Sequence, residues 1–346
     1  VQYQNVALYV NHGISGYVWA ESDYNGAFDG FNFTSTNAKR EPAVGSITVN
    51  LKNENGDVVK TTVTDTAGYY QFVDVLEGNY TLEFVNSDGV VVEGRETGRS
   101  AGLYDFEVSP KAKSYYRAPG NDTTGVTENG VLMAAVSDKF TVPMVALAQA
   151  SGDTDAYVVN ENCGLYVPSY IHGQVWADGN KDGQKDNTES RIKGVKVSLV
   201  TSDGKEVKDV YGNKVQPIIT GDDGKYTFRS IPVGTYRVDI DNGDTDISEF
   251  TVTKFRADGV DESVNNDARN GEGGIKASID WVEIKDLNDN TFKTDAANKN
   301  FTGKINHDQS TVFDMDAGLI RAQSISGLVW AERDYNMRRD DGEERI

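Results

Sequence analysis

Acidic and amide side chains follow a short apolar stretch at a spacing that suits the binding of a hard divalent cation. From Asp178 the chain reads D-x-N-x-D-G-x5-E, the pattern of a twelve-residue calcium loop, with Gly183 at the sharp turn. Six positions would supply the oxygens, the seventh of the loop through its backbone carbonyl: Asp178, Asn180, Asp182, Gln184, Asp186 and Glu189. Oxygen ligands in this number, with no soft ligand nearby, favour calcium over zinc or copper. We therefore predict a Ca2+ site, the alternative being an acidic, solvated turn between two strands.

A second copy of this loop follows the stretch I-S-G-Y-V-W-A that begins at Ile14. Its candidate ligands, taken by the same positions, are Glu21, Asp23, Asn25, Ala27 (through its carbonyl), Asp29 and Glu41. Asn32 falls at position 12 of the pattern, but an insertion intervenes. Glu41 lies five residues before Ser46, just as Glu189 lies five before Gly194. Glu41 is therefore the better candidate for the closing carboxylate.

A third copy follows the stretch I-S-G-L-V-W-A that begins at Ile325. Its candidate ligands are Glu332, Asp334, Asn336, Arg338 (through its carbonyl), Asp340 and Glu343. Met337 replaces the glycine, so this loop must turn without the residue best suited to it. Three copies in one chain do not describe one active site. They indicate the first strand and first loop of a repeated module.

The spacing of the copies divides the 346-residue chain into modules. Gly16 and Gly173 are 157 residues apart, and Gly173 and Gly327 are 154 apart. A segment of that size can bury a core of its own. We predict the end of a preceding module at residues 1–10, complete modules at 11–168 and 169–322, and the start of a truncated third module at 323–346. The chain is expected to be a piece of a longer repetitive protein.

Within the modules the sequence signals are almost all strand and turn. Residues 47–51 (I-T-V-N-L) and 195–200 (V-K-V-S-L-V) alternate apolar and polar side chains, as half-buried strands do. Gly/Asp turns separate such stretches, and no long helical periodicity occurs. The sequence predicts an all-β fold of tandem, Ig-like antiparallel β-sandwiches that carry the calcium loops. Trp19, Trp176 and Trp330 share one repeated position and are expected in the core.

The connections between modules, at residues 10–14, 167–171 and 321–325, are short. They lack the Gly/Ser-rich or Pro-rich composition of a flexible tether. We therefore predict an elongated, semi-rigid rod. Because each loop follows its first strand directly, we expect it at the module end nearest the preceding module.

The charge of the chain limits its partners. Acidic residues outnumber basic ones by 54 to 34, for a net charge of −20, which argues against nucleic acid and anionic lipid surfaces. The apolar stretch 131–147 contains Asp138, Lys139 and Pro143, and it is too short and too charged to insert into a membrane. Cys163 is the only cysteine, so no intramolecular disulfide forms, and we expect a small buried core residue.

The sequence contains no recognisable catalytic pattern. His12, His172 and His307 do not align between the repeats, and no Ser-His-Asp spacing, H-E-x-x-H motif or Gly-rich phosphate loop occurs. The many carboxylates are explained by calcium loops and solvated turns. We predict that the protein is not an enzyme.

Several motifs together resemble the B domains of serine-aspartate-repeat surface proteins of Gram-positive bacteria. They are G-x-V-W-A-D-x-N-x-D-G-x-x-D…E, the strands D-D-G-K-Y-x-F and P-x-G-x-Y-x-V, and the closing D-A-G-L. Such domains are calcium-binding relatives of the collagen-adhesin B-type, prealbumin-like modules. The resemblance is strong in the first half of each module and weakens at residues 31–40 and 87–127. It implies an extracellular, calcium-stabilised stalk that holds a binding region away from the cell wall.

The sequence is also compatible with two other functions. The chain could be an adhesin module that grips a host protein or glycan, or an accessory module of a cell-bound cellulosomal scaffold. The partners expected in every case are calcium ions and neighbouring modules of the same chain. Some B-type relatives form a Lys–Asn or Lys–Asp isopeptide bond. Lys196 is matched by Thr48 in the other module, so no such bond is expected here.

Overall fold

The computed structural model of the chain is built of β-strands and turns. It describes residues 12–22, 24–28, 41–85, 91–92, 106–112, 120–128, 131–143, 158–256, 264–284, 312–321, 327–333, 335–339 and 341–342. No α-helix occurs among these residues, so none of them forms a helix that could cross a membrane. The prediction of an all-β sandwich fold is confirmed.

The first sandwich packs two sheets over a common core. One sheet has the order β12-β1-β13-β8, with β5 also paired to β1. Its strands are β1 (His12–Ala20), β5 (Tyr69–Val75), β8 (Glu107–Val108), β12 (Val158–Asn160) and β13 (Cys163–Tyr166). The other sheet has the order β4-β3-β6-β10-β9, with β11 paired to β6. Its strands are β3 (Thr48–Asn53), β4 (Val58–Val63), β6 (Gly78–Val85), β9 (Thr123–Glu128), β10 (Val131–Ser137) and β11 (Phe140–Val142). A short ribbon joins β2 (Val44–Gly45) to β7 (Val91–Val92).

The second sandwich repeats this plan. One sheet has the order β17-β14-β23-β19, with β22 paired to β14. Its strands are β14 (Tyr170–Ala177), β17 (Lys225–Arg229), β19 (Phe250–Val252), β22 (Val312–Asp314) and β23 (Ala317–Arg321). The other has the order β16-β15-β18-β21-β20. Its strands are β15 (Lys196–Thr201), β16 (Ile218–Ile219), β18 (Gly234–Asp241), β20 (Ala268–Asn270) and β21 (Ala277–Ile284).

The first strand of each module pairs in parallel with the end of the same module, which the sequence did not predict. β14 pairs with β22 over its first half and with β23 over its second half, while β17 runs antiparallel to it. Gly173 lies where the parallel partner changes. A Cβ there would come within 2.0 Å of the Met315 carbonyl oxygen, and a Cβ at Gly16 would come within 1.8 Å of the Glu161 carbonyl oxygen. The repeated glycine is therefore required by close approach of two backbones.

Each module has its own hydrophobic core. The first core gathers residues between Ile14 and Val167, and the second gathers residues between Ile171 and Leu319. The alternation read from the sequence is reproduced in β3 and β15, whose apolar side chains point inward. Apolar burial of this kind is the main favourable contribution to folding.

The repeated tryptophan belongs to the core in both complete modules. Trp19 and Trp176 are fully buried, as predicted, whereas Trp330 in the third copy is half-buried. Cys163 is also buried, and burial raises the pKa of its thiol to about 12. It is a core residue, as predicted.

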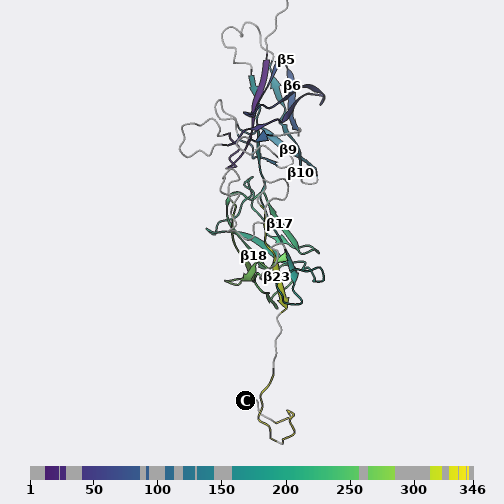
Figure 1. Cartoon of the computed structure of the whole chain (residues 1–346), viewed down its shortest axis with the longest axis vertical. Helices are drawn as coiled ribbons and strands as arrows, with labels where there is room; N and C mark the ends of the chain where they lie inside the picture. Colours follow the sequence, from purple (N-terminus) through teal and green to yellow (C-terminus); the bar gives the residue numbers. More distant parts are fainter. Residues whose placement is uncertain are drawn as a thin grey trace, which may run out of the picture.

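The two sandwiches lie end to end along the long axis of the molecule (Figure 1). Strands β5, β6, β9 and β10 belong to the upper sandwich in that view, and β17, β18 and β23 to the lower. The chain passes between them over the few residues from Val167 to β14.

The loops lie at the opposite end of the module from the one predicted. β14 begins at Tyr170 beside Arg229, which contacts Glu107 of the first module, and it runs away from that contact. The loop that starts at Asp178 therefore lies at the far end of its module. In the first loop, Tyr24 packs against Tyr166, which in turn contacts Tyr211 of the second module. The reason is geometric, since a strand of eight residues carries the chain about 26 Å.

Candidate metal centre

The loop at residues 178–189 is organised around a buried carboxylate. Asp178 Oδ1 accepts the N–H of Lys181 at 2.5 Å, and Asp178 Oδ2 accepts the N–H of Gly183 at 2.9 Å. The hydroxyl of Thr253, from the end of β19, donates to the same Oδ2 at 2.5 Å. Asp178 itself is almost fully buried. The first candidate ligand is thus fixed by its own loop and by a neighbouring strand.

The last candidate ligand closes the loop onto its beginning. Glu189 Oε1 accepts the N–H of Gly179 at 2.9 Å, and Glu189 Oε2 accepts the N–H of Asp186 at 3.2 Å. Between these ends, Asn180 Oδ1 accepts the N–H of Asp182 at 3.0 Å. Side-chain oxygens at positions 1, 3 and 12 of the loop therefore accept N–H groups of the loop's own backbone.

The carbonyl proposed at position 7 lies beside a β-bridge. Gln184 bridges to Asn265, and the two hydrogen bonds of that bridge use the Gly183 carbonyl and the Lys185 N–H. The Gln184 N–H donates instead to Asp182 Oδ1 at 2.8 Å. The carbonyl of Gln184 takes no part in the bridge.

Negative charge is crowded in this loop. The pKa of Glu189 is raised, first by partial burial and then by the neighbouring carboxylates of Asp178 and Asp186, against the lowering effect of its N–H donors. The pKa of Asp186 is lowered, chiefly by the hydrogen bonds of Thr188. A divalent cation is the type of group that relieves such repulsion.

The first loop is held by the same contacts. The hydroxyl of Ser109 donates to Glu21 Oε2 at 3.3 Å, as Thr253 does to Asp178. The Ser22 N–H donates to Glu41 Oε1 at 2.9 Å, as Gly179 does to Glu189. Glu41 therefore occupies the place of the closing carboxylate, on the far side of the insertion. Candidate ligands Asp23 and Asp29 lie outside the described residues.

All three loops share one unusual backbone pattern. The fourth residue has a left-handed conformation in each, with φ of 60° at Tyr24, 65° at Lys181 and 61° at Tyr335. The sixth is left-handed as well, with φ of 74° at Gly26, 82° at Gly183 and 63° at Met337. The third loop thus makes the glycine turn with a methionine, which stores backbone strain.

The turn at positions 5 to 7 is also common to the three loops. The N–H of position 7 donates to the side-chain oxygen of position 5, from Ala27 to Asn25 at 2.5 Å and from Arg338 to Asn336 at 2.7 Å. Glu332 at position 1 of the third loop is half-buried. Candidate ligands Asp334, Asp340 and Glu343 lie outside the described residues.

The donor set fits a hard cation by its chemistry. Within the described part of the chain, no three His, Cys, Asp or Glu side chains converge closely enough to enclose an ion by themselves. Four of the six ligands expected in the second loop are carboxylates that now accept backbone N–H groups, and the set is completed by one amide and one carbonyl oxygen. Calcium binding therefore stays a prediction, and all oxygens are of the type that calcium prefers.

A buried asparagine beneath each loop was missed by the sequence analysis. Asn266 Oδ1 accepts the N–H groups of Ala268 and Gly318, and its amide donates to the Ala268 carbonyl at 3.0 Å. Asn121 makes the matching bonds to Thr123 and Gly164. The only sequence signal was the repeated N-D pair at these positions, which carries no chemistry by itself.

An ion pair that ties the second loop to the end of the module was not predicted either. Lys185 Nζ contacts Asp316 Oδ2, and the two side chains are 14% and 1% exposed. Asp316 Oδ1 also accepts the N–H of Gln174 at 2.7 Å. In the first module the corresponding residues are Phe28 and Asn162, a neutral pair. Lys185 and Asp316 are separated by 131 positions, so no local pattern joins them.

The titration of Asp316 predicts a pH-dependent stability for the second module. Burial, and then the charge of Asp314, raises the pKa of Asp316 to about 7 from an ordinary value of 3.8, against the opposing effect of Lys185. Because the folded pKa is the higher one, the folded state binds this proton more tightly. The stability from this group is present below about pH 4 and is lost as the pH rises to about 7.

The measurement is chemical denaturation with chelator at a series of pH values. In the double variant Lys185→Phe/Asp316→Asn this component of the pH dependence should vanish. A double variant whose unfolding free energy keeps the wild-type slope between pH 4 and 7 would show that Asp316 is not the titrating group.

Sequence comparisons match both modules to one domain family. The SdrD B-like domain matches the chain twice, over residues 12–118 and 170–293. Serine-aspartate repeat-containing protein D of Staphylococcus aureus (strain Newman) is 31% identical over 267 residues, which are 77% of this chain and 16% of that protein. Serine-aspartate repeat-containing protein F of Staphylococcus epidermidis is 28% identical over 268 residues, which are 77% of this chain and 12% of that protein.

Among solved structures, the shaft pilin SpaA of Lactobacillus rhamnosus GG aligns over 91% of this chain and 100% of its own, with a TM-score of 0.26 and 10% identity. The chain spans a small part of the serine-aspartate repeat-containing proteins, 16% of protein D and 12% of protein F. The two matched ranges cover more than half of the 346 residues. The chain therefore belongs to the SdrD B-like domain family.

Proposed function

We propose that the two modules form a calcium-stabilised, semi-rigid stalk of a Gram-positive cell-surface protein, which projects a binding region from the cell wall. The observation that carries the proposal is the recurrence of one loop geometry at the distal end of the first strand. The same two left-handed residues recur in all three loops, and the same bond from the second loop residue to the closing glutamate recurs in two. The first loop keeps this geometry despite its insertion, which supports a type of ligand common to the loops.

Family membership supports the location. The chain belongs to the SdrD B-like family and resembles serine-aspartate repeat-containing proteins of two staphylococci. An extracellular setting supplies calcium at about millimolar concentration, the range in which extracellular calcium modules bind. The proposal assigns no catalytic activity to the modules and leaves recognition of host protein or glycan to another region of the parent protein.

The second loop would hold the ion through six oxygens of its own residues. They are Asp178, Asn180, Asp182, the Gln184 carbonyl, Asp186 and Glu189. When bound, calcium would supply positive charge between carboxylates that now repel one another. Trp176, near the end of the first strand, forms a β-bridge with Arg191 immediately beyond the loop. An ion that fixes the loop would therefore also fix the connection from the first strand to the next part of the module.

Thermal unfolding in calcium and in chelator tests this function. Calcium at about a hundredfold its dissociation constant should add about 2.7 kcal/mol per site, or about 5–10 °C for a module of this size. Glu189→Ala should abolish most of the difference in the second module, because it removes the bidentate ligand. Asn180→Asp keeps an oxygen at position 3 and serves as the matched control with a smaller effect. If all curves coincide, the loops are solvated turns and the calcium stalk is wrong.

A further inference from the structure

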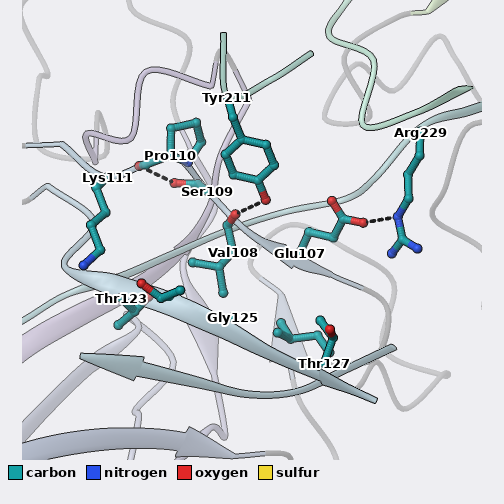
Figure 2. Close-up of a pocket in the computed structure, with 12 residues that line it drawn as sticks. Glu107, Val108, Ser109, Pro110, Lys111, Thr123, Gly125, Thr127, Tyr211 and Arg229 are labelled. Carbon is teal, nitrogen blue, oxygen red and sulfur yellow. Dashed lines mark hydrogen bonds and ion pairs between the residues drawn. The ribbon is translucent and has the colours of Figure 1, made fainter. Parts of the chain in front are cut away.

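The contact between the two modules is built around one carboxylate, that of Glu107 at the start of β8. Its Oε2 accepts the hydroxyl of Tyr166 from its own module and the hydroxyl of Ser230 from the second module, the latter at 2.6 Å. Its Oε1 accepts the Nε–H of Arg229, also from the second module, as Figure 2 shows. One side chain therefore joins donors from both modules.

A tyrosine of the second module completes the contact. The hydroxyl of Tyr211 donates to the Val108 carbonyl at 2.9 Å (Figure 2). Its ring lies 6.2 Å from that of Tyr166, edge to face. Burial, and then the charge of Glu107, raises the pKa of Tyr166, so its phenol stays a neutral donor at physiological pH. The contact is thus polar and directional.

The described residues leave an open space at the joint. A cavity of about 520 Å³ lies beside the contact, between β9 of the first module and Tyr211 and Arg229 of the second. A space of this size leaves room for one module to tilt against the other. Among the described residues, the modules are held at this angle by the polar bonds of Glu107 and Val108 and by the ring contact of Tyr166 with Tyr211.

Glu107, Tyr166, Arg229 and Ser230 are not repeated at the other ends of the modules. The strand registers pair Glu107 with Tyr166 and, at the distal end of the second module, Thr251 with Ile320. At the proximal end of the first module, Val73 and Asp74 occupy the places of Arg229 and Ser230. Asp74 and Ser230 even share the same left-handed conformation, with φ of 55° and 56°.

We propose that the distal end of the first module, with Glu107 at its centre, is a docking surface specific for a module that presents an Arg-Ser pair and a tyrosine. The surface rejects a copy of its own module, because Asp74 would place a second carboxylate against Glu107 where Ser230 now donates. Like charges so placed are a common means of excluding wrong partners. The residues at the contact therefore determine which module can follow the first. This inference rests on the stalk function proposed above, but not on calcium.

The test measures the distance between the modules in the full chain. Spin labels are placed at Asn55→Cys and Ser202→Cys, two exposed turn positions, in a background of Cys163→Ala. Alanine is the residue that the second module carries at this position, as Ala317. Double electron–electron resonance should give one narrow distance peak for this reference chain.

The key variant is Arg229→Val/Ser230→Asp. It places the residue types of Val73 and Asp74, from the proximal end of the first module, at the proximal end of the second. It should lose the narrow peak, in calcium and in chelator alike. Glu107→Thr changes the other side of the joint to the residue type of Thr251, its equivalent in the second module. This variant should also lose the narrow peak. Arg321→Val is the matched control, because it breaks an exposed ion pair with Glu249 at the far end of the second module. It should keep the narrow peak.

A narrow peak retained in both joint variants would overturn the proposal, as would a peak that broadens only in chelator. Thermal unfolding of the same samples separates the two proposals. If calcium has no effect on stability while the joint variants lose their narrow peak, the calcium function fails and the docking surface stands.

Discussion

Replacing Lys185 alone by phenylalanine should destabilise the second module by about 3–5 kcal/mol above pH 7, where Asp316 is ionised, the usual cost of removing one partner of a buried ion pair. Asp316 would keep the N–H of Gln174 but lose its charged partner. The neighbouring carboxylate of Asp314, which already raises the pKa of Asp316, would add to the repulsion. Chemical denaturation of the full chain in chelator measures the loss.

The matched control is the double variant Lys185→Phe/Asp316→Asn, which installs the neutral pair of the first module. There, Phe28 lies over Trp19 with ring centroids 5.4 Å apart, and Asn162 Oδ1 accepts the N–H of Tyr17 at 3.1 Å. The double variant should be as stable as the wild type, or more stable by about 1–4 kcal/mol. If the single variant loses no more stability than the double one, Lys185 and Asp316 are not energetically coupled.

Replacing Trp176 by alanine should destabilise the second module by about 3–5 kcal/mol, the cost of emptying a large core site. The indole is fully buried and lies against Gly318, where a Cβ would come within 2.6 Å of its Cζ2. The backbone beneath the ring is held by paired strands and cannot move in to fill the space. The free energy of unfolding in denaturant measures the effect.

Trp281→Ala is the control for this variant. Trp281 is 43% exposed and has the guanidinium of Arg237 4.9 Å from its ring centroid. Its loss should cost about 0.5–1 kcal/mol, the value of an exposed cation–π contact. Equal losses in the two variants would mean that Trp176 does not anchor the core.

Much of the fold could be predicted from the sequence because it rests on local signals. Alternation in stretches such as 47–51 and 195–200 marks strands whose faces differ in burial, and the structure confirms both strands. The repeated tryptophan could be assigned to the core because a large apolar side chain at a fixed strand position is favourably placed only when it is buried. Candidate ligands, which stay a prediction, could be proposed because a cation loop draws nearly all its oxygens from one short segment.

Other features could not be predicted. The expected antiparallel pairing was incomplete, and the expected position of the loops was wrong. The first strand pairs in parallel with the last, and the loops lie at the distal end of each module. Lys185 and Asp316 could not be assigned a role from the sequence, although they lie within the second loop and the closing D-A-G-L motif. The same holds for Glu107 and Arg229, since each is one charged residue among many.

The sequence by itself determined the strands, the modules and the spacing of the candidate ligands, because each depends on residues close together in the chain. Only the tertiary structure decided which distant side chains meet. Lys185 reaches Asp316, and Glu107 reaches Arg229 across 122 positions, because strands from both ends of a module lie side by side and two modules abut. A charge in isolation is solvated, and it gains a specific partner only where folding removes it from water.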